Sequence, residues 1–337
     1  MSAPPGRGAR AARFEGRRCL VTGGMGFIGS NLALALADAG AEVRVVDAMI
    51  PTHGANLHNL EGAARPIDVV VADVGDCARI RSAVAEAEFV FNLAGQISHV
   101  DSMEDPIADF DWNARSHLAF LELLRAVGSR AVVVYTSTRQ IYGRPLYVPV
   151  DESHPVQPVD VNGISQHAAE QFHLLYARVH GLRACSLRLT NVYGPRLRLR
   201  GSRQGVLAVF LQRALEGQTI PVYGDGEHIR DFLYVSDAVE ALLAAALAPE
   251  AVGEAFNVSH SVAVTLREAA EAIVDAAGSG RVELVPWPRE RAAIDIGDFL
   301  GDFAKARRIL GWEPRVSFGD GLRATIAFYR EHRHWYL

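Results

Sequence analysis

Several features that would place this chain in a specialised class are scarce or missing. Its 337 residues include three cysteines, Cys19, Cys77 and Cys185, which lie mostly in apolar runs and indicate reduced core thiols rather than a disulfide framework. No run of about eighteen apolar residues occurs, which argues against a membrane span. A net charge of -5 without a basic stripe argues against nucleic acid as a partner. What remains is a soluble globular protein, with the cytoplasm as its expected location.

The N-terminal segment differs in composition from the rest of the chain. Residues 1–13 are rich in Ala, Arg, Gly and Pro and lack the apolar stretch of a secretory signal. Such a composition buries too little apolar surface to fold, so residues 1–14 are predicted to form a disordered tail. An Arg-rich, acid-poor transit peptide is the alternative interpretation.

Apolar, β-branched runs recur through the first half of the chain, separated by Ala/Leu-rich helical patterns. The runs are continuously apolar rather than alternating, which is typical of strands buried on both faces of a parallel sheet. The sequence therefore predicts an α/β fold with a Rossmann-type, doubly wound parallel sheet. The predicted strands span residues 18–22, 42–47, 68–72, 89–93, 131–137 and 183–189, and the predicted helices span 29–39, 77–85, 107–127 and 165–179.

A glycine-rich turn follows the first predicted strand and opens the first predicted helix. Gly23, Gly26 and Gly29 would let the turn close tightly, let the backbone approach a pyrophosphate, and let the helix pack near the sheet. Asp47 ends the second strand, where a carboxylate accepts ribose hydroxyls and disfavours a 2′-phosphate, so NAD is the expected cofactor. The full set of expected cofactor-binding residues is Gly23, Gly26, Phe27, Ile28, Gly29, Asp47, Asp73, Val74, Leu93 and Ala94; for Asp73 a helix cap is an equal alternative.

The pattern changes after Gly194-Pro195, where loops, short strands and turns replace the regular alternation. Residues 15–194 are therefore assigned to an NAD-binding Rossmann domain and residues 195–337 to a smaller C-terminal substrate-binding lobe. The segment 233–260 contains a helical pattern and is expected to pack back on the first domain, so that the two domains interleave.

Further motifs occur in the order and spacing of one known family. They are N-L-A-G at 92–95, S-H-V-D-S at 98–102, T-R-Q-I-Y-G at 138–143, L-R-L-T-N-V-Y-G-P at 187–195 and G-D-G-E-H-I-R-D-F at 224–232. With the glycine turn, they make the chain from Arg17 onward resemble the extended short-chain dehydrogenase/reductases, the NAD-dependent epimerase/dehydratase family that acts on nucleotide sugars. The resemblance implies a nucleotide-sugar substrate and a homodimer that pairs helices 107–127 and 165–179.

The same resemblance implies roles for individual positions. Thr138 matches the family's catalytic Ser or Thr, whereas Asn162 and Gln166 stand where the family has its catalytic Tyr and Lys. An amide cannot shuttle a proton near neutral pH, so the usual acid/base pair is missing. His99 and Tyr142 are candidates to carry the proton instead, with Asp101 and His167 as further candidates. The residues expected to bind substrate are Arg139, Asn191, Arg230, Arg291 and Asp295.

Three hypotheses about function remain open. The first is a nucleotide-sugar isomerase similar to a divergent subgroup of the family, the flavin-independent pyranose–furanose mutases acting on GDP- or UDP-sugars in sugar or antibiotic biosynthesis. The second is an NAD-dependent 4-epimerase that uses a substitute base. The third is a non-catalytic protein that binds NAD and a nucleotide sugar.

Two further expectations concern the chemistry. The mutase hypothesis allows a divalent metal held largely by the substrate phosphates, because no His or Cys cluster predicts a protein metal site. A 4,6-dehydratase is disfavoured, because Arg139 and Gln140 follow Thr138 at the place where the family's dehydratases carry an Asp-Glu acid/base pair.

Overall fold

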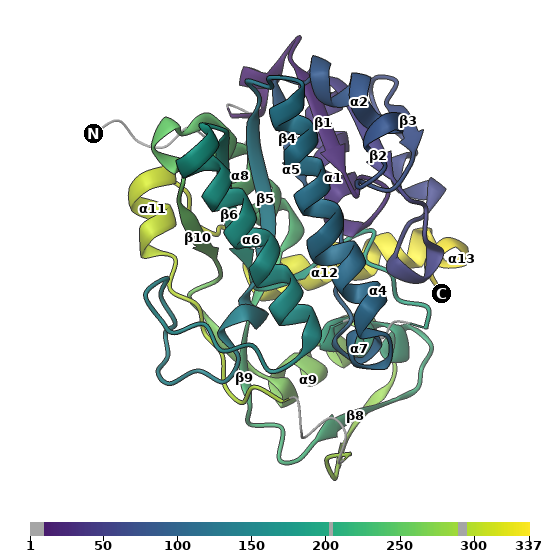
Figure 1. The fold of residues 1–337 in the computed structure, drawn as a ribbon. Helices are drawn as coiled ribbons and strands as arrows, with labels where there is room; N and C mark the ends of the chain where they lie inside the picture. The colour runs from purple at the N-terminus through teal and green to yellow at the C-terminus, as the bar shows by residue number, and fades with distance from the viewer. Residues whose placement is uncertain (1–9, 202–204, 289–294) are drawn as a thin grey trace.

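A twisted parallel sheet forms the centre of the first lobe in the computed structural model, which describes residues 10–201, 205–288 and 295–337 (Figure 1). The strand order is β10-β6-β5-β4-β1-β2-β3, and every neighbouring pair is parallel. The predicted α/β, doubly wound fold is therefore confirmed. The strands are β1 (Arg18–Thr22), β2 (Glu42–Asp47), β3 (Asp68–Val71), β4 (Phe89–Asn92), β5 (Val132–Thr138), β6 (Arg183–Leu189) and β10 (Ala255–Val258).

Helices cover both faces of this sheet. Adjacent residues of β5 point to opposite sides, so that Val133 joins one hydrophobic core and Val134 the other. One core lies under α1 (Phe27–Asp38) and α8 (Val235–Leu247), and the other under α2 (Cys77–Glu86), α5 (Ser116–Ala126) and α6 (Val161–His180). Burial on both faces explains why the strands are continuously apolar.

The helix predicted over 107–127 is interrupted. It appears as α4 (Pro106–Phe110), a π-helical turn η4 (Asp111–Arg115) and then α5. Asn113 lies in that turn, where its side chain donates hydrogen bonds to the Gln96 carbonyl oxygen and to Asp109. The apolar periodicity predicted the helix but carried no signal for this break, because the cause is a polar contact with a distant loop.

The helix predicted over 165–179 begins earlier, at Val161. Asp160 caps it, since its carboxylate accepts a hydrogen bond of 2.7 Å from the Gly163 backbone N–H. The left-handed Gly181 follows its last residue. The extension places Asn162 in the first turn of the helix and not in the loop before it.

The sequence predicted a disordered tail over residues 1–14, and this prediction is wrong for residues 10–14. Residues 1–9 lie outside the described ranges. Residues 10–14 form a 3-10 turn, and the fully buried ring of Phe14 packs edge-on against Phe89 at 4.8 Å. The Arg10 guanidinium donates to the backbone oxygens of Leu310 and Gly311. Composition alone missed this segment, because a single aromatic anchor and one buried Arg hold it in place.

The C-terminal half forms a second lobe and also returns to the first. Its own core gathers around Phe210, Ile273 and Tyr329, whereas α8 packs on the large sheet of the first lobe and β10 is a strand of it. The second lobe contains β7 (Asn191–Tyr193), α7 (Val206–Leu215), β8 (Thr219–Tyr223), β9 (Ile229–Tyr234), β11 (Ala263–Thr265), α9 (Leu266–Ala277) and β12 (Arg281–Val285). Three helices follow them: α11 (Ala304–Leu310), α12 (Phe318–Glu331) and α13 (Arg333–Tyr336).

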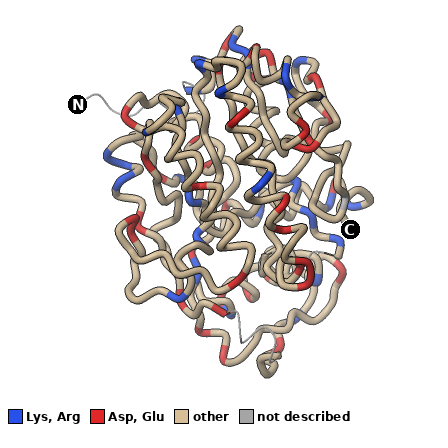
Figure 2. Tube along the Cα trace, in the orientation of Figure 1, with Lys and Arg blue, Asp and Glu red and all other residues tan. Residues whose placement is uncertain are grey.

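Charged residues of both signs are interspersed over the trace (Figure 2). No helix within the described ranges combines the length and apolar character needed to cross a membrane.

Cys19 and Cys185 are buried, and burial raises the pKa of each thiol to about 12, which keeps them protonated in the core.

Candidate active site

A cavity of about 760 Å³ lies where the carboxyl ends of the parallel strands meet the second lobe. The register aligns Thr22 of β1 with Val46 of β2 and Asn92 of β4, so the loops after these strands open on the same edge. A crevice at this edge is the usual ligand site of an open α/β sheet. All ten predicted cofactor-binding residues line the cavity.

The glycine turn is packed too tightly for any side chain at two of its positions. Gly23 has φ of +67°, and a Cβ there would lie 2.6 Å from the Leu93 carbonyl oxygen. A Cβ on Gly29 would lie 2.2 Å from the carbonyl oxygen of Gly23. At Gly26 the nearest atom would be 3.3 Å away. The turn therefore requires glycine at these two positions, and the backbone N–H groups at the start of α1 are of the kind that favour an anion such as a pyrophosphate.

Asp47 stands at the end of β2, beside the glycine turn. Its carboxylate accepts hydrogen bonds from the backbone N–H groups of Met25 at 2.9 Å and Met49 at 2.8 Å. Burial raises the pKa of Asp47, although these hydrogen bonds act against the rise. The two hydrogen bonds hold the carboxylate in one orientation at the wall of the cavity, and the ribose contact stays a prediction. Asp73 lines the cavity and accepts a hydrogen bond from the Gly75 N–H. The N-cap of α2 is Asp76, so the alternative role of Asp73 as a helix cap is wrong, and a contact with the cofactor stays its predicted role.

Four predicted substrate residues, Arg139, Asn191, Arg230 and Asp295, gather on the side of the cavity formed by the second lobe. Arg139 donates from Nη2 to Asn191 at 3.0 Å, and its guanidinium lies 5.0 Å from the centre of the Phe299 ring. Arg230 donates to the Gly297 carbonyl oxygen at 2.5 Å and pairs with Asp295 at 3.5 Å. Burial and the neighbouring Arg230 lower the pKa of Arg139 to about 9. Two close guanidinium groups favour an anion with more than one charge.

One nitrogen of the Arg139 guanidinium can still donate a hydrogen bond to a ligand. Its Nη1 atom is buried and has no hydrogen-bond partner in the described part of the chain. The fifth predicted substrate residue, Arg291, lies outside the described residues.

Asn162 and Gln166 occupy successive turns of α6, but they serve a buried network. Asn162 is 1% exposed and donates to the Gln96 carbonyl oxygen at 2.8 Å and to Asp109 at 3.1 Å. Gln166 accepts a hydrogen bond of 2.6 Å from the Tyr135 hydroxyl, and it also lines the cavity. Asn162 does not line the cavity, so its predicted place among the catalytic residues is not supported.

Asp109 is the centre of this network and was not predicted. Its Oδ2 atom accepts from the side-chain amides of Gln96, Asn113 and Asn162 at 3.0–3.1 Å. Burial raises the pKa of Asp109, while these donors act in the opposite direction. The sequence offers no local signal for this arrangement, because the three donors come from a loop, a π-helical turn and a later helix.

Tyr142 is not available as a proton carrier. It is fully buried outside the cavity, where its hydroxyl donates to Asn257 at 2.7 Å and accepts from Arg188 at 2.7 Å. Burial raises its pKa to about 12. The prediction failed because the motif places Tyr142 close to Thr138 along the chain, whereas the 3-10 turn η5 (Arg139–Tyr142) directs it into the core.

No lysine reaches the cavity. Lys305 is the single lysine of the chain, and it lies on α11, where it pairs with Glu254 at 2.8 Å. Tyr223 is the one tyrosine among the residues described as lining the cavity. Another Tyr–Lys pair therefore does not replace Asn162 and Gln166 within the described part of the chain.

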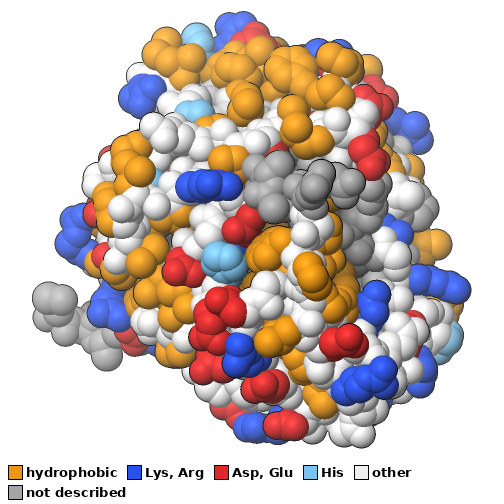
Figure 3. Space-filling view, turned by 90° about the horizontal axis from the view of Figure 1, so that it is seen from below, with side chains coloured by type: hydrophobic (Ala, Val, Ile, Leu, Met, Phe, Trp, Pro, Cys, Tyr) orange, Lys and Arg blue, Asp and Glu red, His pale blue; other side chains and the backbone are white. Residues whose placement is uncertain are grey.

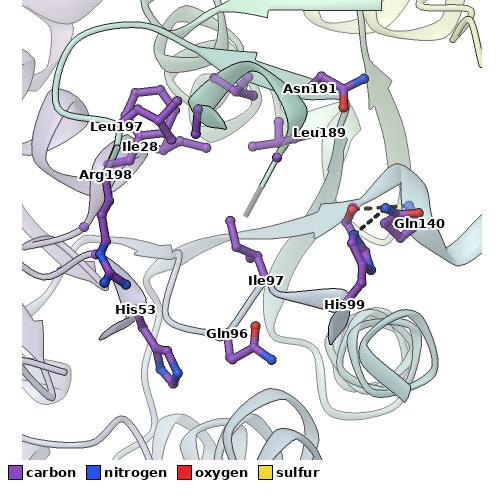
Figure 4. Close-up of a pocket in the computed structure, with 18 of the residues that line it drawn as sticks. Ile28, His53, Gln96, Ile97, His99, Gln140, Leu189, Asn191, Leu197 and Arg198 are labelled. Atoms are coloured by element: carbon purple, nitrogen blue, oxygen red, sulfur yellow. Dashed lines mark hydrogen bonds between the residues drawn. The ribbon is translucent and has the colours of Figure 1, made fainter. Parts of the chain in front are cut away.

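Thr138 and His99 do reach the cavity. Thr138 ends β5, and its hydroxyl accepts from the Gln140 backbone N–H at 3.2 Å. His99 begins α3 (His99–Glu104), and its ring contacts Asp160 and Gln140 at one end of the cavity (Figure 4). His167 lies on another face of α6, 3.8 Å from Glu170, and Asp101 lies outside the main cavity. No group of three or more His, Cys, Asp or Glu residues in the described ranges is arranged to hold a metal ion.

Comparisons with known proteins agree with this geometry. Residues 19–259 match the model of the NAD dependent epimerase/dehydratase family. The UDP-glucose 4-epimerase of Mycolicibacterium smegmatis is 34% identical over 93% of this chain and 98% of its own length. The dTDP-glucose 4,6-dehydratase of an Actinoplanes species is 32% identical over 95% of this chain and 99% of its own. The structure of Thermotoga maritima UDP-glucose 4-epimerase with UDP-glucose superposes with a TM-score of 0.85, at 31% identity over 94% and 99% of the two chains.

These likenesses extend over both lobes, and they include the glycine turn and the substrate side of the cavity. The chain belongs to the NAD-dependent epimerase/dehydratase family, whose members here are named for reactions on nucleotide sugars.

Proposed function

We propose that this protein is an NAD-dependent nucleotide-sugar 4-epimerase. The observation that carries the proposal is the continuity of the cavity: the glycine turn and Asp47 open on the same space as Thr138, Asn191 and Arg230. A cofactor and a sugar diphosphate bound at its two sides would meet in the middle. Relatives of nearly the same length that are named UDP-glucose 4-epimerase support this choice over the mutase that the sequence favoured.

The residues of the cavity fit the roles that epimerisation requires. NAD, when bound, supplies the acceptor for the hydrogen and electron pair that leave the sugar carbon and later returns them. The glycine turn and Asp47 would hold that cofactor, while Arg230, Asn191 and Arg139 would bind the substrate diphosphate. Thr138 would donate or accept a hydrogen bond at the sugar hydroxyl and so orient the reacting carbon.

A dehydratase fits the site less well, although the Actinoplanes relative carries that name. Elimination of water needs one group that protonates the leaving hydroxyl and another that removes the proton from the adjacent carbon. The residues after Thr138 are Arg139, which bonds to Asn191, and Gln140, an amide that cannot transfer a proton at neutral pH.

A hydride-free pyranose–furanose mutase remains the second candidate. It is favoured by one specific observation, the amides Asn162 and Gln166 at the positions that resemble the family's Tyr and Lys, in a chain whose single lysine lies elsewhere. Such an enzyme would need tight binding of the diphosphate while the anomeric bond breaks. The paired guanidinium groups of Arg139 and Arg230 are suited to that task.

One experiment separates these candidates. The purified protein is incubated with NAD and a panel of UDP-, dTDP- and GDP-hexoses, unlabelled or deuterated at C4, and the products are identified by proton NMR. A 4-epimer that retains deuterium, with transient reduced nicotinamide, supports the epimerase. Ring contraction without cofactor reduction supports the mutase, and tight binding without any product supports a binding protein.

We also propose that two copies associate through the surface formed by α4 and α6. Large apolar side chains are exposed there, among them Ile107, Phe110, Ile164 and Val179. In the view from below, hydrophobic side chains form a band along the upper edge (Figure 3). A monomer in light scattering at micromolar concentration would contradict this proposal.

A further inference from the structure

Three side chains from separate elements form a hydrogen-bonded chain at one end of the cavity. The His99 Nδ1 atom lies 2.6 Å from Asp160 Oδ2, and its Nε2 atom lies 2.5 Å from the Gln140 amide nitrogen. His99 begins α3, Asp160 caps α6, and Gln140 lies in the turn that follows Thr138. Figure 4 shows His99 and Gln140 facing each other on the cavity wall.

The partners of His99 fix its tautomer. A carboxylate can only accept a hydrogen bond, so the ring nitrogen facing Asp160 carries the hydrogen. The other nitrogen, Nε2, then presents a lone pair toward the cavity, and the Gln140 amide donates to it. A sugar hydroxyl is a donor of the same kind and could take the place of that amide.

Gln140 is only half satisfied by this arrangement. Its Oε1 atom is buried and has no hydrogen-bond partner among the described residues. A buried amide oxygen without a partner is unfavourable, which marks a place for a donor that arrives with a ligand. If the amide rotates by half a turn, the same oxygen can accept a hydrogen bond from a protonated Nε2. Gln140 can therefore accompany either protonation state of His99.

Asp160 is held rigidly in the position that orients the imidazole. It is 5% exposed, and its second oxygen accepts the Gly163 N–H at 2.7 Å. Other charged groups that act on it are Arg139 and, with opposite sign, Asp109. Burial alone would raise the pKa of Asp160, but the hydrogen bond and charge of His99 lower it, so the carboxylate stays ionised beside the ring.

We propose that His99 is the acid/base residue of the reaction and that Asp160 is its positioning residue, an inference that rests on the proposed 4-epimerase function. The O–H bond of the sugar hydroxyl breaks as its proton forms an N–H bond at Nε2. The reverse transfer returns that proton to the oxygen, so His99 ends each turnover as it began. Asp160 fixes the reactive tautomer and stabilises the imidazolium, the role that a buried carboxylate plays beside other catalytic histidines.

The first test observes the histidine directly and does not depend on activity. The NAD-loaded protein is labelled with ¹⁵N-histidine and its imidazole signals are recorded by NMR, with His99→Gln used to assign the signal. We expect the hydrogen on Nδ1 in the neutral ring. In Asp160→Asn a measurable fraction of the Nε2–H tautomer should appear, because the anionic acceptor is gone while an Asn still caps α6. An Nε2–H tautomer in the parent protein, or an unchanged tautomer ratio in Asp160→Asn, would overturn the assignment of Asp160.

The second test measures turnover of whichever sugar is epimerised. His99→Gln should lower kcat about 100-fold with little change in KM. Asp160→Asn should lower kcat about 10-fold with little change in KM, because the carboxylate that fixes the reactive tautomer of His99 is gone. His180→Gln and Asp76→Asn are matched controls: an exposed histidine on α6 and an exposed cap of α2, both away from the cavity.

The outcomes separate a failure of the proposed 4-epimerase function from a failure of the assignment of His99. If the parent protein epimerises no nucleotide sugar, the proposed function fails, and the tautomer seen by NMR still decides whether Asp160 orients His99. If it epimerises a sugar but His99→Gln retains more than a third of kcat, the proposed function stands and the assignment of His99 is wrong.

Discussion

The glycine turn, which lines the cavity, and the buried polar stripe of α6, which reaches the cavity through Gln166, are built in different ways. The glycine turn between β1 and α1 is made by the backbone, and its close contacts are those of Gly23 and Gly29 with carbonyl oxygens. The buried polar stripe of α6 is made by side chains. Asn162, Gln166 and Glu170 recur every four residues on one face of the helix, and all three are buried. A buried helix face that is polar must be satisfied by partners from elsewhere, so this region depends on tertiary contacts in a way that the glycine turn does not.

The largest effect is expected at the glycine turn. Gly29→Ala would place a methyl group 2.2 Å from a carbonyl oxygen that cannot move away, which should cost about 3 kcal/mol and lower NAD affinity more than 100-fold. Calorimetric titration with NAD measures this. Gly319→Ala on α12, where the nearest atom is 3.7 Å away, should leave NAD affinity unchanged. Normal NAD binding by Gly29→Ala would show that the turn is not the cofactor site.

Rebuilding the family's usual pair tests the α6 stripe. Asn162→Tyr with Gln166→Lys would insert a large ring at a position that is 1% exposed, and would remove donors to Gln96 and Asp109. We expect the free energy of unfolding to fall by about 2–3 kcal/mol, measured with urea, without a gain in sugar oxidation. The control, Leu175→Tyr with Gln171→Lys, introduces the same residues on the more exposed side of the helix. Stable, faster oxidation would show that the ancestral pocket is still present.

The same stripe predicts sensitivity to acid. Burial would raise the pKa of Glu170, but the His167 ring 3.8 Å away and the hydrogen-bonded Arg188 guanidinium lower it to about 2 in the folded protein. A group with a lowered folded pKa stabilises the fold above its unfolded pKa, near 4.5, and this stability is lost as pH falls toward 2. We expect a loss of about 2 kcal/mol across that window in urea denaturation. The slope should be smaller in Glu170→Gln and unchanged in the surface variant Glu42→Gln.

The smallest effect is expected for Arg139, on the proposed substrate side of the cavity. Arg139→Leu removes the unpaired Nη1 and the hydrogen bond to Asn191, but leaves Arg230 in place. The affinity for UDP should fall about 10-fold, and that for NAD should stay the same. Fluorescence or calorimetric titration of both ligands checks this. An equal loss for both ligands would mean that Arg139 supports the fold of the cavity and not the diphosphate.

Prediction from the sequence succeeded where local pattern controls structure. The strands and the glycine turn lie where the apolar runs and the spacing of Gly23, Gly26 and Gly29 placed them. It was wrong at Tyr142, which the turn after Thr138 sends into the core, and at residues 10–14, which Phe14 anchors. It also missed Asp160, although an Asp before a helical segment is a recognisable cap signal.

By itself, the sequence determined the alternation of strands and helices and the glycine turn at the carboxyl edge of the sheet, because each depends on residues close together along the chain. Only the tertiary structure decided that Asn162 belongs to the Asp109 network and that His99 meets Asp160 and Gln140. Those contacts join residues 41–61 positions apart, and their geometry depends on how the loops after β4 and β5 pack against the start of α6.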